Sequence, residues 1–144
     1  MSYSKMVIPN RSNHEWRYTP WEKIHPSKVE TVPVIKSARV QLNGKQIEAQ
    51  SVRDYDSNAE ISRTFLQESN NSMHSITIDE SQDCNIVEIE SDESQVVCHV
   101  HITVESSTAL QIIFKGNCNW FGIHITSDIK ANSNLFVGIL NDLS

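Results

Sequence analysis

The stretch that decides the fold runs from Ser75 to Leu140, where nearly the same short block occurs three times. The blocks are Ile76-Thr77-Ile78-Asp79-Glu80, Ile102-Thr103-Val104-Glu105 and Ile125-Thr126-Ser127-Asp128. Their first residues are 26 and then 23 positions apart. After a polar turn, each block is followed by a second apolar run, at 85–90, 109–114 and 134–140. Repeats of this length that consist of short strands are typical of stacked coils, of which the parallel β-helix is the main all-strand form.

Apolar and polar residues alternate inside each repeat, which is typical of strands with one buried face. Stacking the coils predicts an interior column of isoleucines at 76, 102 and 125 and an exterior column of threonines at 77, 103 and 126. In the second run, Ile89 is predicted to align with Ile112 and Val137. The sequence therefore predicts a mainly β protein, with about three coils of a parallel β-helix beginning at residue 73 and running to 144.

Residues 1–72 are predicted to form a small α+β region that precedes the coils. Asn43-Gly44 lies between alternating residues, and both positions tolerate the positive φ angles of a type I′ hairpin turn. Ser57 and Glu60 have the spacing of a capping box, which predicts a helix start at Ser57. Ile61 and Phe65 would share the buried face of this helix, which should end near residues 69–72.

An aromatic segment lies in the proline-punctuated N-terminal arm. Trp16, Tyr18 and Trp21 are three large aromatic residues within six positions. Side chains of this size are costly to leave in water, so we expect the arm to pack on the rest of the domain as an anchor. A ligand platform made of these rings is the alternative.

Composition and charge exclude several classes of function. The 144 residues suffice for one domain with a real core. The net charge is −6 and the 12 Lys and Arg residues are scattered, which argues against a nucleic-acid surface or an anionic membrane as partner. The sequence has no apolar run of signal-peptide or membrane-spanning type. We therefore expect a cytoplasmic protein that binds neither nucleic acid nor membrane.

The three cysteines are Cys84, Cys98 and Cys118, and their wide spacing fits neither a disulfide framework nor a paired zinc site. Cys98 has the same parity as Val100 and Ile102, so it is predicted to be a small buried hydrophobe. A thiolate that binds a metal cluster is the chemical alternative.

His99, His101 and Glu105 have the same parity and would project from one face of a strand. Two imidazoles and a carboxylate can bind a divalent metal, and His124 is a candidate fourth ligand. The pattern partly resembles the first metal motif of cupin barrels, which would imply a small metal-dependent enzyme. It departs from that motif at Glu93 and Ile112, where the family has glycine.

The other interpretation is that these histidines lie on the solvent-exposed face of a strand, with Glu105 as a solvated neighbour. The repeat favours it, because Glu105 occupies the place of Asp79 and Asp128 in the neighbouring blocks. A position that is acidic in all three coils is expected at an architectural turn.

Residues Glu15-Trp16-Arg17-Tyr18-Thr19-Pro20 resemble the N-terminal signature of SufD, the scaffold subunit of SUF-type iron–sulfur cluster assembly. The matching residues, in order, are Pro9, Arg11, Glu15, Trp16, Arg17, Tyr18 and Thr19. In that family a hairpin, a helix and a right-handed parallel β-helix follow, which is also the order predicted here. The resemblance covers this whole chain but only the N-terminal portion of a SufD-like protein.

The resemblance implies a non-enzymatic scaffold that binds SufB-like and SufC-like subunits, with ATP hydrolysis carried out by the SufC-like partner. An iron–sulfur cluster would be held only within the larger complex. The cysteine and histidine that the family uses in cluster building lie later than Ser144, so no functional residue is transferred to this chain. A β-helix with an open end also predicts self-association of the chain, because unpaired strand edges are templates for pairing.

Overall fold

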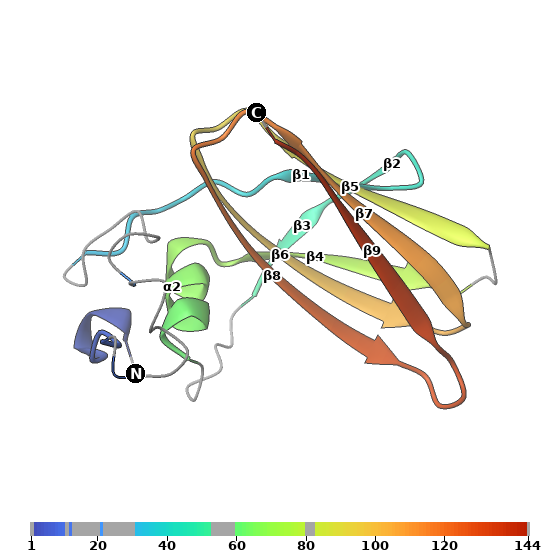
Figure 1. The fold of residues 1–144 in the computed structure, drawn as a ribbon, viewed down its shortest axis with the longest axis horizontal. Helices are drawn as coiled ribbons and strands as arrows, with labels where there is room; N and C mark the ends of the chain where they lie inside the picture. Colours follow the sequence, from blue (N-terminus) through green and yellow to red (C-terminus); the bar gives the residue numbers. More distant parts are fainter. Residues whose placement is uncertain are drawn as a thin grey trace.

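A computed structural model describes residues 2–10, 12, 21, 31–52, 60–79 and 83–143. The protein is mainly β (Figure 1). Its described elements are η1 (Tyr3–Lys5), β1 (Arg39–Leu42), β2 (Lys45–Ile47), β3 (Ala49–Ser51), α2 (Ile61–Ser69), β4 (Ser72–Ile78), β5 (Cys84–Ser91), β6 (Gln95–Val104), β7 (Thr108–Gly116), β8 (Trp120–Ile129) and β9 (Leu135–Leu143). Residues 15–20, which carry the SufD resemblance, lie outside the described part of the chain.

The predicted hairpin is confirmed. Strands β1 and β2 pair in an antiparallel register that places Leu42 opposite Lys45. Asn43 and Gly44 have φ angles of 49° and 82°, as a type I′ turn requires. The Asn43 side chain also accepts a hydrogen bond from the Ile86 amide at 2.8 Å, which ties the turn to β5.

The predicted helix is confirmed in its C-terminal part. Helix α2 ends at Ser69, and Ile61 and Phe65 are buried on one face as expected. The predicted start is wrong: α2 begins at Ile61, and Glu60 before it has a non-helical backbone (φ −58°, ψ 161°), whereas a cap at Ser57 would make Glu60 the third helical residue. Ser57 itself lies outside the described residues. Gly122 allows α2 to approach the sheet closely, because a Cβ atom at this position would lie 2.5 Å from the Leu66 side chain and from the Trp120 ring.

The strands from β4 onwards alternate between two sheets. The five-stranded sheet has the order β2-β1-β5-β7-β9, and the four-stranded sheet has the order β3-β4-β6-β8. Within each sheet the later strands pair in parallel: β5 with β7 and β7 with β9 in one sheet, and β4 with β6 and β6 with β8 in the other. The two sheets enclose the main hydrophobic core, which is rich in valine and isoleucine.

The predicted register is right between the first and second repeats and wrong between the second and third. Ile76 pairs with Ile102, and Thr77 pairs with Thr103, as expected. In the next step, however, Ile102 is opposite Ser127 and Ile125 is opposite Val100. The observed pairing therefore differs from the predicted one by two residues, and the same side chains still face the core. Alternation alone determines which side chains face the core, and a shift by two leaves that unchanged.

The second run shows the same type of difference. Ile112 pairs with Val87 and Ile139. Ile89 is opposite Phe114, and Val137 is opposite Leu110. The predicted column of Ile89, Ile112 and Val137 is therefore wrong by two residues at each step, although all of these positions have the predicted parity.

The predicted acidic column is wrong in the third repeat. The Glu105 amide donates to the Ile78 carbonyl at 2.8 Å, and the Lys130 amide donates to the Val104 carbonyl at 2.9 Å. Glu105 and Lys130 are therefore equivalent corner positions. Their side chains form an ion pair at 3.5 Å, and Asp128 lies two residues earlier on β8.

Helix α2 lies beside the four-stranded sheet (Figure 1). A second apolar cluster joins the helix to the outer face of this sheet. Tyr3 and Phe65 are fully buried there together with Val97 of β6. Trp21 is buried in the same cluster, and its indole N–H donates to the Tyr3 hydroxyl at 2.9 Å. The anchoring role predicted for the aromatic arm is thus confirmed for Trp21, while Trp16 and Tyr18 lie outside the described residues.

The two ends of the pair of sheets differ. At one end, antiparallel strands cover the parallel ones, β1 and β2 beside β5, and β3 beside β4. At the other end, β8 and β9 are the edge strands, with a neighbour on one side only among the described residues.

None of the described helices has the length and apolar character needed to cross a bilayer.

Candidate functional site

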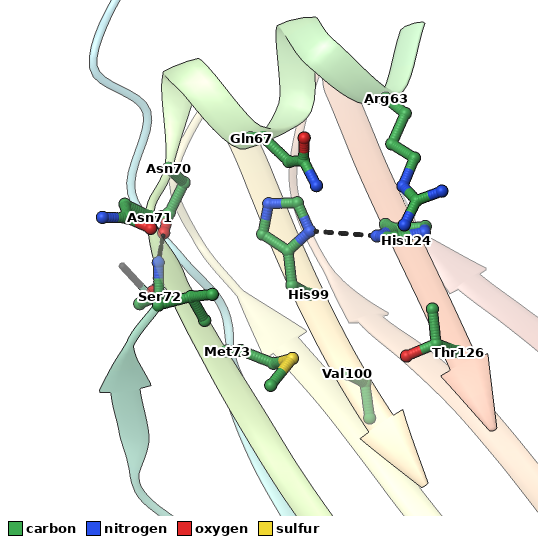
Figure 2. A pocket seen from close by; sticks show the side chains of 11 residues that line it. Arg63, Gln67, Asn70, Asn71, Ser72, Met73, His99, Val100, His124 and Thr126 are labelled. Atoms are coloured by element: carbon green, nitrogen blue, oxygen red, sulfur yellow. Dashed lines mark hydrogen bonds between the residues drawn. The ribbon is translucent and has the colours of Figure 1, made fainter. Parts of the chain in front are cut away.

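The structure separates the four predicted metal ligands and brings two of them together. The Nδ1 atoms of His99 on β6 and His124 on β8 lie 3.4 Å apart, and the rings are nearly perpendicular, at 86° (Figure 2). The two residues face each other directly across the parallel pair of strands. Both lie under α2, on the outer face of the four-stranded sheet.

His101 and Glu105 have other partners. The His101 ring contacts the Thr126 hydroxyl at 2.7 Å through Nδ1 and the Asp128 carboxylate at 3.2 Å through Nε2. Glu105 pairs with Lys130. Within the described residues, no three His, Cys, Asp or Glu side chains form a group that could hold a metal ion. The four residues of the cupin-like prediction are therefore divided among three separate pairs.

The alternative prediction, of histidines on a solvent-exposed face, is wrong for His99. This residue is only 7% exposed because α2 lies across it. Its Nε2 atom is 3.1 Å from the Leu66 carbonyl oxygen near the end of the helix. Periodicity identifies the polar face of a strand, but it cannot say that a helix covers that face.

A cavity of about 230 Å³ adjoins the two histidines. It lies between α2 and the strands β4, β6 and β8 (Figure 2). Its lining residues are Val52, Arg63, Gln67, Asn70, Asn71, Ser72, Met73, His99, Val100, His124 and Thr126. Among them, Arg63 and Gln67 are one helical turn apart on α2. Their i, i+4 spacing places both on one face of the helix, a different face from that of Ile61 and Phe65. From the sequence, this shared face is the signal that could have identified the helical side of the cavity.

The hydrogen bonds assign the protons of the histidine pair. Because a carbonyl oxygen only accepts, the contact with Leu66 places a proton on Nε2 of His99. The Nδ1 atom of neutral His99 then carries a lone pair and accepts from Nδ1–H of His124. This assignment leaves Nε2 of His124 as the basic nitrogen of the pair.

Burial lowers the pKa of both imidazoles. For His99, burial is the main cause, the Arg63 charge adds to it, and hydrogen bonds to the backbone at Leu66 and Asn70 oppose it. For His124, burial again comes first, followed by the positive charges of Arg63 and His99. The neutral form of both rings is therefore favoured at pH 7.

Cys98 lies on the opposite face of β6, inside the core, as predicted. It is fully buried, and burial raises the pKa of its thiol to about 11. Its sulfur lies 3.9 Å from Nδ1 of His74. His74 is buried too, and burial lowers the pKa of its imidazole, as it does for His99 and His124. A thiol in this state is a packing group and a poor nucleophile. Cys84 is exposed and Cys118 is partly buried.

The histidine pair predicts a pH dependence of stability. Because the native pKa values of His99 and His124 are lowered, the unfolded chain binds more protons below about pH 6.5. The free energy of unfolding is therefore expected to decrease as the pH falls below about 6.5, by up to about 1.4 kcal/mol per pH unit for each titrating histidine. Urea denaturation over this pH range measures the effect.

A matched pair of variants isolates this contribution from that of the carboxylates. The double variant His99→Gln and His124→Gln should have a shallower decrease of stability with falling pH than the unmodified protein. The variant His101→Gln, which changes an imidazole outside the cavity, should retain the full decrease. Equal pH slopes in all three proteins would contradict the assignment.

Comparison of the chain with protein families, with curated proteins and with solved structures finds no match.

Proposed function

We propose that this chain is a SufD-like scaffold component, corresponding in extent to the N-terminal portion of such proteins, which acts through protein–protein contacts in iron–sulfur cluster assembly. In this proposal the alternating parallel strands are the opening coils of a right-handed parallel β-helix. The motif at residues 15–20 and the order of hairpin, helix and alternating strands support it. No catalytic step is assigned to the chain itself, and ATP hydrolysis belongs to a SufC-like partner.

The observation that carries the proposal is the open end formed by Ile129 of β8 and Val137 and Ile139 of β9. These residues are paired with Val104, Leu110 and Ile112, which are all buried in the core. Directly paired residues of neighbouring strands point to the same face of a sheet. Ile129, Val137 and Ile139 therefore point toward the interior, yet they are 46%, 50% and 64% exposed. We call these three residues the open end.

The edge strand at the open end has the properties of a contact surface. Strand β9 has nine residues, and Phe136 and Leu140 on its other face are exposed as well. Edge strands that remain in water are usually short, charged or covered, since their free N–H and C=O groups pair with other chains. The edge at the opposite end follows this rule, because β2 has three residues and begins with a lysine.

These features support protein binding at the open end. A partner that adds strands to β8 and β9 would satisfy the backbone groups of both edges and bury the three core-facing side chains. We assign this role to a SufB-like subunit within a complex that also holds a SufC-like subunit. In the absence of these partners, two copies of this chain can cover each other's open ends, which gives self-association.

Co-purification tests the assignment. The chain, carrying an affinity tag, is co-expressed with the SufB-like and SufC-like subunits of its own organism. The proposal predicts a complex that survives size-exclusion chromatography. The recovery of neither subunit with the chain would contradict the partner assignment, and the tagged chain alone, tested for folding by circular dichroism, serves as the control.

A further inference from the structure

The turn between β1 and β2 carries a chemically labile pair of residues, Asn43-Gly44. The Gly44 amide nitrogen can attack the side-chain carbonyl carbon of Asn43, because glycine has no side chain to hinder the approach. A five-membered succinimide forms, and the Asn43 side-chain nitrogen leaves as ammonia with the proton of the Gly44 amide. Water then opens the ring and leaves aspartate or isoaspartate at position 43. Both residues are exposed to the water that this last step uses.

The conformation of the turn opposes this reaction. The succinimide ring contains Cβ of Asn43 and the nitrogen of Gly44, so these two atoms have to lie on the same side of the bond between Cα and the carbonyl carbon. Asn43 has a φ angle of 49°, as in a type I′ turn, and ψ at this position of such a turn is about +30°. That angle places the two atoms on opposite sides of the bond. The turn therefore has to open before the ring can close.

Hydrogen bonds to β5 hold the turn closed. The Asn43 side-chain oxygen accepts from the Ile86 amide at 2.8 Å, and its side-chain nitrogen donates to the Asn85 side-chain oxygen at 2.9 Å. The Asn43 backbone amide also donates to the Ile86 carbonyl at 2.8 Å. Opening the turn disturbs all three bonds, so β5 controls access to the reactive conformation.

The same hydrogen bonds continue across the sheet in a fixed direction. The buried Asn85 side chain donates to the Thr108 hydroxyl at 2.7 Å, and this hydroxyl donates to the Ala109 carbonyl at 3.2 Å. The Ile86 amide can only donate at one end of this chain of bonds, and the Ala109 carbonyl can only accept at the other. The orientation of each group between them is thereby set. Asn43 supplies a donor that a carboxylate at position 43 lacks.

We propose that Asn43 is a deamidation site that the fold keeps closed, and that deamidation, once it occurs, releases the β1–β2 hairpin from β5. Aspartate at position 43 would bring two acceptor oxygens together where Asn43 and Asn85 now share a hydrogen. Isoaspartate would add a carbon atom to the main chain of a two-residue turn, which changes the geometry that joins the two strands. Either product weakens the contact between the turn and β5.

The consequence concerns the end of the sheets opposite the open end. Strand β1 pairs with β5 from Arg39 opposite Glu90 to Leu42 opposite Val87. Loss of this pairing would leave β5 with unpaired N–H and C=O groups, which are templates for other chains. A chain deamidated at Asn43 would then have free strand edges at both ends of its five-stranded sheet. The inference is independent of the scaffold function, because it uses no residue of the open end.

The rate of deamidation at Asn43 tests the first part of the proposal. The wild-type chain is incubated at mildly alkaline pH, with and without urea, and the peptide that contains position 43 is followed by mass spectrometry. We expect deamidation to be at least about tenfold slower in the folded chain than in urea, because the turn and its hydrogen bonds have to open first. Equal rates in the folded and unfolded chain would overturn the proposal.

Two variants test the contribution of β5. Asn85→Ala removes the partner of the Asn43 side-chain nitrogen, so deamidation of the folded variant should be about three to ten times faster than in the wild type. Asn117→Ala changes an exposed asparagine between β7 and β8 and should leave the rate at Asn43 unchanged. Circular dichroism verifies that both variants are folded during the incubation. If the folded variants deamidate at the same rate, β5 does not control the reaction.

Hydrogen exchange of the deamidated chain tests the second part. The product carries one additional negative charge and is separated from the unmodified chain by anion exchange. Amides of β1 and β5 should exchange at least about tenfold faster in the product, whereas amides that join β6 to β8 should be unchanged. The same exchange at β1 and β5 in both species would overturn the release of the hairpin.

Discussion

Replacing Phe65 by alanine is expected to lower the free energy of unfolding by about 3–5 kcal/mol, the largest loss for any single residue of α2. Phe65 is fully buried. Its ring packs edge-to-face against Tyr3 at 5.1 Å and against Trp120 at 5.9 Å between centroids. It thereby joins the N-terminal segment, the helix and β8. Removing the ring would leave a cavity at the centre of the second apolar cluster, and urea denaturation measures the cost.

Phe136 provides the matched control, because it is the same residue type but is 71% exposed on β9. Phe136→Ala should change the free energy of unfolding by less than about 0.5 kcal/mol, as is usual for exposed positions. Both variants are measured at the lowest workable protein concentration, so that self-association does not contribute. Similar losses for Phe65→Ala and Phe136→Ala would show that α2 is not held to the sheet by this cluster.

The second large effect is expected at the open end. The double variant Val137→Lys and Ile139→Lys should weaken self-association of the chain by more than about 100-fold. Burial of a valine or isoleucine side chain contributes about 1.5–3 kcal/mol, and a lysine in its place would also have to be desolvated. Because both side chains are exposed in the single chain, the variant should still fold. Sedimentation velocity over a wide concentration range measures the association.

The control places the same two charges on a strand inside the sheet. Ser75 and Thr77 are exposed on β4, have the same i, i+2 spacing and lie away from the open end. Ser75→Lys with Thr77→Lys adds equal charge and should leave the association unchanged. If the unmodified chain sediments as a monomer at every concentration, or if both double variants behave alike, the open end is not the contact surface.

Local patterns predict much of this fold. The Asn43-Gly44 turn, the buried face of α2 and the inward parity of the strands follow from turn geometry and from periods of two and 3.6 residues. The register does not follow in the same way. Pairing Ile125 with Val100 and pairing it with Ile102 both place apolar side chains inside, so similarity between the blocks selected the wrong one. The corner hydrogen bond from Lys130 to Val104 marks the register that forms.

The candidate site was harder to predict than the fold. Two of its histidines were identified from the strand pattern, but their neighbour across the strands depends on the register, which places His124 opposite His99. The cover over them comes from α2, an element far away in the sequence. A strand with alternating polar residues carries no signal of a helix above its polar face. Gly122 on β8 is the residue that does indicate a close neighbour, because its missing side chain makes room for Leu66 of α2.

Amide hydrogen exchange can show whether a protein partner covers the open end. Exchange of the amides in residues 120–129 and 135–143, which form β8 and β9, is compared between the dilute chain and its co-expressed complex with SufB-like and SufC-like subunits. We expect that amides on the free edges of both strands exchange fast in the chain alone and become protected in the complex. Exchange of these amides that is the same in the two states, while the complex is intact, would contradict it.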